Sequence, residues 1–466
     1  MSSFEPLYSA EEMRAAEARY PGSMEELMER AGSQAALVAL NGFPQAARWT
    51  IVAGGGSNGG DGRVVARRLD EAGKEVRIVD AKAGETDLGE PDAIVDALFG
   101  TGFTGEPRPE AAALIDRIND AGVPVLAIDL PSGVDASTGE IAGAAVRATA
   151  SVTFHGRKVG LVVAPGRFHA GEVRVADIGL EPGETRDRLV TTELLRTVPR
   201  RGAEDNKYTA GHVLVVGGSR GLTGAPSLTA MAALRADAGY VTLAVPESTL
   251  PVFERRILEA VKRPLPEKDG LVTAEAADTV LELAKKANAV ALGPGLGRGP
   301  GPQALVRRLL NELDLPVVVD ADALFELEPG EWAAPRVLTP HEGELGRLLG
   351  RSSKEIAAHR LASVHEAAER FGCVVLLKGA DSLVAAPAAG VLVSALGLPS
   401  LATAGTGDVL TGIVAAFLAK GMEPQLATAA ASAAEQRASV EAPQRAGLVA
   451  SDLLDSLPRA LNGGAG

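Results

Sequence analysis

The sequence has few aromatic residues, a single cysteine and no apolar run long enough to cross a membrane. Aromatic residues make up 3% of the 466 residues. The only cysteine, Cys373, cannot form an internal disulfide and lies in an apolar run, so we expect a buried, unreactive thiol in a reducing cytoplasm. The longest apolar run, residues 409–419, is about half of the roughly 20 residues that a transmembrane helix needs. The N-terminus lacks the basic start and apolar stretch of a signal peptide. These absences predict a cytoplasmic protein without a membrane partner.

The sequence also has fewer basic than acidic residues. Lys and Arg number 46 against 60 Asp and Glu, which gives a formal net charge of −14. This balance argues against a general nucleic-acid binder. It leaves room for small anionic ligands, which backbone amides and helix N-termini can hold without a basic surface.

Short β-branched runs alternate with Gly-rich turns and Ala-rich stretches, which is typical of an α/β fold with a largely parallel sheet. The expected strands are residues 50–53, 75–79, 93–97, 123–128, 150–154, 212–216, 241–245, 289–292, 317–319, 337–338 and 374–377. The expected helices are residues 60–71, 109–120, 225–238, 303–313, 342–349, 354–370 and 407–419. Strand patterning stops over residues 180–207, where Pro, Gly and mixed charges dominate. A chain of this length usually forms two domains, and we place them at 1–195 and 196–466.

The first half carries a glycine-rich turn, GGGSNGGDG at residues 54–62, between an expected strand and an expected helix. Such a turn lets backbone N–H groups approach a phosphate closely, although a tight turn without a ligand is the alternative. Further polar turns follow other strands, at DALFGTGFTGE (96–106) and IDLPSG (128–133). Because ligands of open parallel sheets bind at the carboxyl ends of strands, these turns should converge on one crevice. Asp129 is then the candidate general acid or base, or else an Asp that merely caps its turn.

These motifs, together with YSAEEMRAAEA, LMERAG, TFHGRKVGL and ADIGL, resemble the NAD(P)H-hydrate epimerase family over nearly all of residues 8–180. The resemblance implies a doubly wound, Rossmann-like fold that interconverts the R and S epimers of nicotinamide nucleotides hydrated at ring atom C6. It implies that Asp129 transfers the proton, and that Asn58, Asp96 and Ser132 hold a potassium ion. The substrate would contact Ser57, Asn58, Gly59, Gly60, Asp61, Gly100, Thr101, Gly102, Phe103, Thr104, Gly105, Glu106 and Asp129.

The sharpest signal of the second half is ATAGTGDVLTGIVAAFLAKG, residues 402–421. Gly405, Thr406 and Gly407 lead into a helix and present several free N–H groups at its start, with Asp408 beside them. Such an arrangement can hold a transferring phosphoryl group and place a carboxylate to accept a proton from the attacking hydroxyl. An Asp in a first helical turn is alternatively only a partner of the helix dipole.

Other turns follow strands of this half, and among the six histidines only His341 lies in one of them, TPHEGE (339–344). His155, His169, His212, His359 and His365 are assigned no role. Together with GHVLVVGGS, LGPGLG, VVVDADAL, VLLKGADSLVA and LATAGTGDVLTG, this turn is similar to the ADP-dependent NAD(P)H-hydrate dehydratases, which have a ribokinase-like fold. The similarity covers residues 211–457.

The second resemblance implies that ADP phosphorylates the C6 hydroxyl of the S epimer, after which phosphate leaves and the reduced nicotinamide is restored, with AMP as the other product. It implies Asp408 as the base and magnesium bound with ADP. The nucleotide would contact Lys378, Gly379, Ala380, Asp381, Ser382 and Gly407. The hydrated dinucleotide, NAD(P)HX, would contact Ala225, Gly295, His341 and Asp408. We also expect a homo-oligomer.

Several positions depart from the two families. Gly55 and Ser57 replace a Pro and an Asn of the first glycine-rich loop, while Asp237, Phe325 and Ser382 differ from the common residues of the second family. None of these changes removes a catalytic group. The alternatives are a small-molecule kinase in the second half, a degenerate dinucleotide-binding module in the first, and a dehydrogenase. The last is the weakest, because no acidic residue stands where a Rossmann ribose contact is expected.

Overall fold

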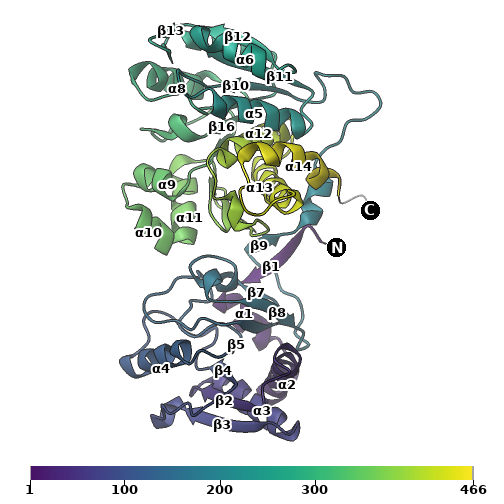
Figure 1. Ribbon diagram of the computed structural model, residues 1–466, viewed down its shortest axis with the longest axis vertical. Helices are drawn as coiled ribbons and strands as arrows, with labels where there is room; N and C mark the ends of the chain where they lie inside the picture. Colours follow the sequence, from purple (N-terminus) through teal and green to yellow (C-terminus); the bar gives the residue numbers. More distant parts are fainter. Residues whose placement is uncertain (1, 464–466) are drawn as a thin grey trace. The chain divides into compact units, whose positions relative to one another are not determined.

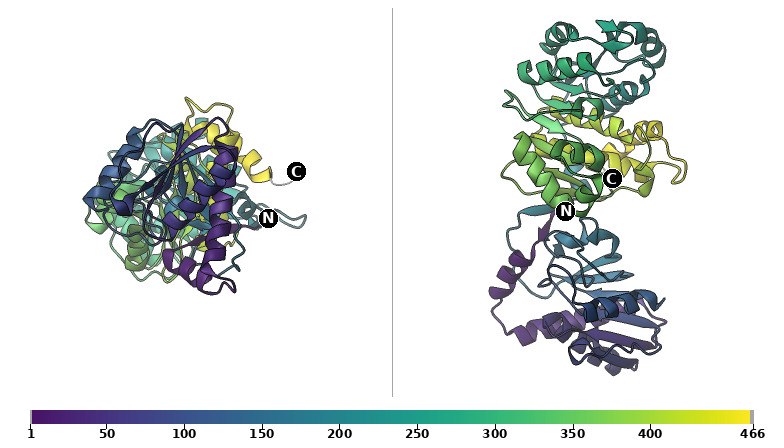
Figure 2. Two further views of the ribbon diagram at one scale, coloured as in Figure 1. Left: turned by 90° about the horizontal axis from the view of Figure 1, so that it is seen from below. Right: turned by 90° about the vertical axis from the view of Figure 1, so that its left-hand side faces the viewer.

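The computed structural model describes residues 2–463, and the chain folds into two compact units (Figures 1 and 2). We call residues 6–187 with 357–359 the N unit. The described part of the C unit comprises residues 2–5, 188–356 and 360–463. Strand β1 (Phe4–Tyr8) therefore gives its first residues to the C unit and its last residues to the N unit.

The N unit is built on a six-stranded parallel sheet of order β3-β2-β4-β5-β6-β8. The strands are β2 (Arg48–Ala53), β3 (Glu75–Asp80), β4 (Ala93–Ala97), β5 (Val125–Ile128), β6 (Ala150–Phe154) and β8 (Glu172–Ala176). The chain runs from β2 out to β3 and back to β4, so the strand order reverses between β2 and β4. A crevice at the carboxyl ends of strands is expected at such a reversal.

Helices cover both faces of this sheet (Figure 1). Helices α2 (Met24–Gly42) and α3 (Ser57–Glu71) pack with Trp49, Ile51 and Val95 on one face. Helix α4 (Pro109–Asp120) packs with Val52 and Ile94, the alternate residues, on the other face. Because successive strand residues point to opposite faces, burial on both sides explains the continuous apolar strands. This doubly wound arrangement agrees with the sequence prediction.

The C unit has a larger mixed sheet. Its parallel strands follow the order β12-β11-β10-β15-β16-β17-β18, and β19 and β20 continue antiparallel before β9 joins parallel to β20. The bounds are β9 (Asp187–Val190), β10 (His212–Val216), β11 (Tyr240–Pro246), β12 (Val261–Leu265), β15 (Ala289–Leu292), β16 (Val317–Val319), β17 (Arg336–Leu338), β18 (Val374–Leu377), β19 (Ser382–Ala385) and β20 (Leu392–Ser394).

One face of this sheet packs against α5 (Gly224–Arg235), α12 (Thr406–Ala419), α13 (Pro424–Glu441) and α14 (Ala450–Asn462), which share one core cluster with the strands. Helices α7 (Ala276–Ala284), α8 (Pro300–Glu312) and α11 (Arg360–Phe371) bury their apolar residues outside that cluster, on the other face (Figure 1). Helix α12 is apolar all round because α5 and α13 enclose it. None of the helices within residues 2–463 is long and apolar enough to cross a membrane.

The predicted elements differ from the structure in several places, and three of the differences concern segments for which a prediction was made. The helix expected over residues 354–370 is interrupted, forming α10 (Ser353–Ala358) and then α11. The stretch 180–207, expected to lack strands, contains β9. The helix expected from residue 60 begins at Ser57 instead. Cys373 is buried as predicted, and burial raises the pKa of its thiol.

Candidate functional sites

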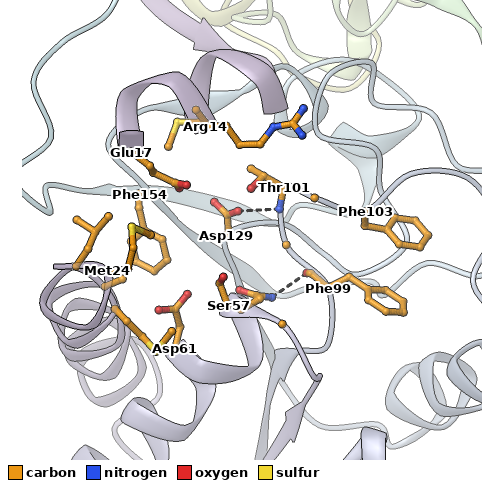
Figure 3. Close-up of a pocket in the computed structure, with 18 of the residues that line it drawn as sticks. Arg14, Glu17, Met24, Ser57, Asp61, Phe99, Thr101, Phe103, Asp129 and Phe154 are labelled. Carbon is orange, nitrogen blue, oxygen red and sulfur yellow. Dashed lines mark hydrogen bonds between the residues drawn. The ribbon is translucent and has the colours of Figure 1, made fainter. Parts of the chain in front are cut away.

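A pocket of about 680 Å³ opens in the N unit at the carboxyl ends of β2, β4 and β5. The three turns that were expected to converge all contribute to it, and α1 (Ala10–Ala18) and α2 complete the wall (Figure 3). Its polar lining side chains include Glu17, Ser57, Asn58, Asp61, Asp129 and Lys158. Met24, Met28 and Phe154 supply an apolar surface among them. A pocket of this size and mixture can hold a ring with a few polar substituents.

The glycine-rich turn enters helix α3 one turn earlier than predicted. Ser57 and Asn58 are therefore helical, and their backbone N–H groups belong to the unpaired set at a helix start. Gly59 packs directly on the turn, since a Cβ there would lie 1.9 Å from the carbonyl oxygen of Gly54. Gly59, Gly60 and residues 104–106 lie outside the described lining of the pocket, whereas Gly100, Thr101, Gly102 and Phe103 line it. The turn thus offers an anion-binding helix end beside the pocket.

Asp129 lies at the end of β5 with a left-handed backbone, φ +69°, and is 8% exposed. Its Oδ1 lies 2.7 Å from Nζ of Lys158 and accepts a hydrogen bond of 3.3 Å from the Thr153 hydroxyl. Its Oδ2 accepts a hydrogen bond of 3.1 Å from the backbone N–H of Thr101 (Figure 3). Lys158 is itself fully buried and also donates to Thr153 Oγ1 and to the Phe154 carbonyl. Asp129 is therefore held as a fixed carboxylate facing the pocket.

Two further carboxyls face the same pocket with different surroundings. Burial raises the pKa of Asp61 to about 8, and the negative charges of Asp129 and Glu17 act in the same direction. The pKa of Glu17 is raised by burial and by Asp129, against the positive charges of Lys158 and Arg14. Asp61 therefore faces the pocket mainly as the neutral acid at neutral pH.

Beside the pocket, Asn58, Asp96 and Ser132 form a buried polar cluster. The Ser132 hydroxyl donates to Asp96 Oδ1 at 2.6 Å, and the Ser132 backbone N–H donates to Asp96 Oδ2 at 2.8 Å. The Asn58 amide donates to the Phe99 carbonyl, while its Oδ1 is buried without a hydrogen-bond partner. Burial raises the pKa of Asp96 to about 6, despite the bonds from Ser132. An unpaired buried oxygen next to a carboxylate and a hydroxyl is a donor set that suits a hard cation.

In the C unit, helix α12 begins at Thr406, directly after Gly405 with φ +95°. A Cβ on Gly407 would lie 3.2 Å from Nζ of Lys378, so this glycine lets the lysine approach the helix start. Asp408 is half-buried on the first turn, and its backbone carbonyl accepts from the Thr229 hydroxyl at 3.0 Å. Free amides, an ammonium and a carboxylate therefore meet at one helix end.

The charges around Asp408 are mostly negative. Lys378 pairs with Asp320 at 2.8 Å, and the Thr411 hydroxyl donates to the other oxygen of Asp320 at 2.7 Å. Burial raises the pKa of Asp408 to about 7, with Asp320 acting in the same direction and Lys378 opposing. Burial opposes the charged form of Lys378, but its carboxylate neighbours, Asp320 first, raise its pKa overall. Asp408 is thus close to the pKa that suits a base at neutral pH.

The loop from Lys378 to Ser382 carries the predicted nucleotide contacts, and a buried arginine supports it. Arg360, 2% exposed, lies 3.2 Å from Asp381 Oδ1 and donates 2.8 Å to the Asp381 carbonyl. It also pairs with Glu342 at 2.5 Å. A Cβ on Gly379 would lie 2.4 Å from Nη2 of Arg360, so the guanidinium packs directly under the loop that also contains Ala380.

The residues predicted to line the dinucleotide site come from different elements. Gly295, φ +61°, adjoins Ala225, since a Cβ on the glycine would lie 3.4 Å from Ala225 Cβ. His341 caps the N-terminus of α9 (Glu342–Leu349), with its Nδ1 accepting from the Gly343 N–H at 2.9 Å. One ring nitrogen of His341 therefore caps the helix, while the side chain, 57% exposed, remains accessible to solvent.

Sequence reasoning did not single out Lys158, Glu17, Asp320 or Arg360. Lys158 lies within the motif TFHGRKVGL, and Asp320 lies within VVVDADAL. Neither motif indicates which residue the charged side chain pairs with. A charged residue at the end of an apolar strand is the signal that could have identified Asp320.

Two family models match the chain. A model described as NAD(P)H-hydrate dehydratase matches residues 213–459, and one described as YjeF-related protein N-terminus matches residues 24–89 and 79–160. A bifunctional NAD(P)H-hydrate repair enzyme Nnr of Moorella thermoacetica is 40% identical, covering 89% of this chain and 87% of the relative. The protein of that name from Escherichia coli K12 is 33% identical, covering 94% and 89%.

Solved structures resemble the second part of the chain. An ADP/ATP-dependent NAD(P)H-hydrate dehydratase from Bacillus subtilis, co-crystallized with ATP and Mg²⁺, is 30% identical. It covers 59% of this chain and 97% of its own, with a TM-score of 0.53. A ribokinase-like superfamily protein from Enterococcus faecalis, 21% identical, covers 61% and 98% with a TM-score of 0.52. The latter likeness concerns the fold alone and agrees with the ribokinase-like prediction.

Proposed function

Because the chain belongs to the family of bifunctional NAD(P)H-hydrate repair enzymes, we propose that its two domains carry out successive steps of cofactor repair. The domain of residues 1–195 interconverts R- and S-NAD(P)HX. The domain of residues 196–466 dehydrates the S epimer to NAD(P)H at the expense of ADP, giving AMP and phosphate. A cytoplasmic location and a homo-oligomeric state stay predictions.

The observation that carries the dehydratase assignment is Asp408 beside Lys378 and the amides at the start of α12. Asp408 accepts the proton of the C6 hydroxyl, whose oxygen attacks the terminal phosphoryl group of ADP while AMP leaves. The C6–O bond then breaks, phosphate departs with the electron pair, and the N1 lone pair forms an iminium. Loss of a proton from C5 restores the ring. The amides of Gly405 to Gly407 and Lys378 stabilise the transferring group.

Magnesium fits this site because carboxylates outnumber cations there. Asp320, Asp322 and Glu344 all raise the pKa of Asp408, and Lys378 opposes them. A nucleoside diphosphate adds further negative charge, so a divalent ion bound to its phosphates would offset the excess of negative charge at the site. The loop of Lys378, Gly379, Ala380, Asp381 and Ser382 is proposed to hold the nucleotide.

Potassium fits the cluster in the N unit. Asn58, Asp96 and Ser132 would hold it, because the unpaired Asn58 Oδ1 needs a positive partner and all the available donors are oxygens. Its charge would favour the ionised form of Asp96 and stabilise the turn that follows β4.

Asp129 is proposed to transfer the proton of the hydrated ring. The turn from Ser57 to Asp61, with Gly100 to Phe103, is proposed to bind the substrate.

The dehydration rate should depend on pH through Asp408. A base acts in its ionised form, so kcat/KM should rise with pH through about 7 and level off above it, because the pKa of Asp408 is about 7. The measurement is NADH formation from S-NADHX and ADP across this range.

Asp322→Asn is a second variant that tests the same assignment. Asp322 is one of the carboxylates that raise the pKa of Asp408, and Asn keeps an acceptor for the Gly297 N–H. The variant should move the rise in kcat/KM to lower pH. A wild-type profile that is flat across neutral pH would contradict the assignment of Asp408 as the base.

A further inference from the structure

We propose that Asp61 is a second proton-transfer residue of the epimerase site, serving as the acid that complements the Asp129 base. This inference rests on the proposed epimerase function and extends it to a particular pair of side chains. Asp61 comes from the first turns of α3 and Asp129 from the end of β5, and both carboxyls point into the pocket lined by Phe154 and Met24 (Figure 3).

The two carboxyls have opposite surroundings. Asp129 faces the Lys158 ammonium and accepts from the Thr101 N–H and the Thr153 hydroxyl. Among the hydrogen bonds described for residues 2–463, none involves the carboxyl of Asp61. A carboxylate without donors in a partly buried site is unfavourable, so Asp61 is stable there as the neutral acid.

Neighbouring charges reinforce this difference. Burial raises the pKa of Asp61 to about 8, Asp129 and Glu17 act in the same direction, and the positive charge of Lys158 opposes them. Lys158 is engaged with Asp129, and Arg14 acts on Glu17. One carboxyl paired with an ammonium and another without a hydrogen-bond donor are the kind of contrast in surroundings that acid–base enzymes use.

The chemistry of the hydrated ring requires such a pair. C6 carries a hydroxyl and the ring nitrogen N1, so it is a hemiaminal carbon that can open to an aldehyde and an amine. Asp129 takes the hydroxyl proton, and the electron pair released from the O–H bond forms the second C6–O bond of the aldehyde. The C6–N1 bond breaks at the same time, and its electron pair goes to N1, which takes the proton of Asp61. After the aldehyde turns its other face to N1, the nitrogen adds to C6 and both protons return. No redox partner or nucleotide is consumed.

The test follows epimerisation by the full chain without nucleotide, so that the dehydratase step cannot proceed. Enriched S-NADHX is incubated with wild type or Asp61→Asn, and chromatography measures the approach to the R,S mixture above the spontaneous rate. We expect kcat to fall by about 10²-fold or more with KM little changed, since general acid catalysis contributes at that level. Wild-type kcat should fall as pH rises through about 8, where Asp61 loses its proton.

Glu17→Gln gives a second readout that does not depend on the folding of the Asp61 variant. Removing this negative charge should move the alkaline fall of kcat to lower pH, because Glu17 raises the pKa of Asp61. An Asp61→Asn variant that changes KM alone, or an alkaline fall that Glu17→Gln leaves in place, would overturn the inference and reduce Asp61 to a binding residue. Wild type that fails to accelerate epimerisation would instead contradict the proposed function itself.

Discussion

Asp408→Asn should lower the ADP-dependent formation of NADH from S-NADHX by about 10²- to 10⁴-fold, the range that a positioned general base contributes. Asn has nearly the same shape and can keep the helix start of α12 in place, but it cannot accept the hydroxyl proton. The pair between Lys378 and Asp320 does not involve the Asp408 side chain and should persist. Nucleotide binding should therefore survive while turnover is lost.

The measurement combines NADH absorbance with a direct binding assay for ADP. A matched variant is Asp455→Asn, an exposed carboxylate on α14 whose charge has no part in either site. It should leave the rate unchanged. An Asp408→Asn protein that restores NADH at more than about half the wild-type rate would contradict the assignment, because a lost base cannot have so small an effect.

Asp129→Asn should abolish catalysed epimerisation, again by about 10²- to 10⁴-fold, while ADP-dependent dehydration of pure S-NADHX continues. The variant also leaves the buried Lys158 without its carboxylate, and breaking a buried ion pair by removing one partner costs about 3–5 kcal/mol. Loss of epimerase activity could then reflect an unfolded N unit. Circular dichroism melting of the variant checks this.

The double variant Asp129→Asn with Lys158→Met separates the two effects. It removes both buried charges together, so it should melt closer to wild type than Asp129→Asn alone, since an apolar group replaces the unpaired ammonium. It should still lack epimerase activity. A folded double variant that epimerises at the wild-type rate would rule out Asp129 as the proton-transfer residue.

Much of the fold follows from local sequence pattern. The buried strands β4, β6, β10, β15 and β18 were predicted with their observed bounds, because short β-branched runs between turns have few other conformations. Helix α13 was not predicted, since its Ala-rich sequence buries residues all round and shows little periodicity. Strand β9 was not predicted because its pairing with β20 depends on a partner far along the chain.

The candidate sites likewise combine features that local sequence predicts with contacts between distant segments. The glycine-rich turns and Asp408 were identifiable because the residues that make an anion site are consecutive. The partners that set their chemistry come from distant segments: Lys158 is 29 positions beyond Asp129, and Asp320 is 58 before Lys378. The raised pKa of Asp61 comes from burial and from the charges of Asp129 and Glu17, which no local sequence pattern connects with it. Motifs therefore indicated the candidate sites, and tertiary contacts determine the surroundings of their charged groups.

The most direct test of the repair function follows reduced-nicotinamide absorbance while the purified full chain acts on mixed R,S-NADHX with magnesium and ADP, ATP or no nucleotide. We expect ADP to restore NADH. The amount of NADH formed should exceed the amount of S-NADHX present at the start, and the whole mixture should be converted faster than spontaneous epimerisation allows. Conversion that stops at the S share would contradict the epimerase half. If no nucleotide restores NADH, the repair function is wrong and a small-molecule kinase becomes the better interpretation of the second domain.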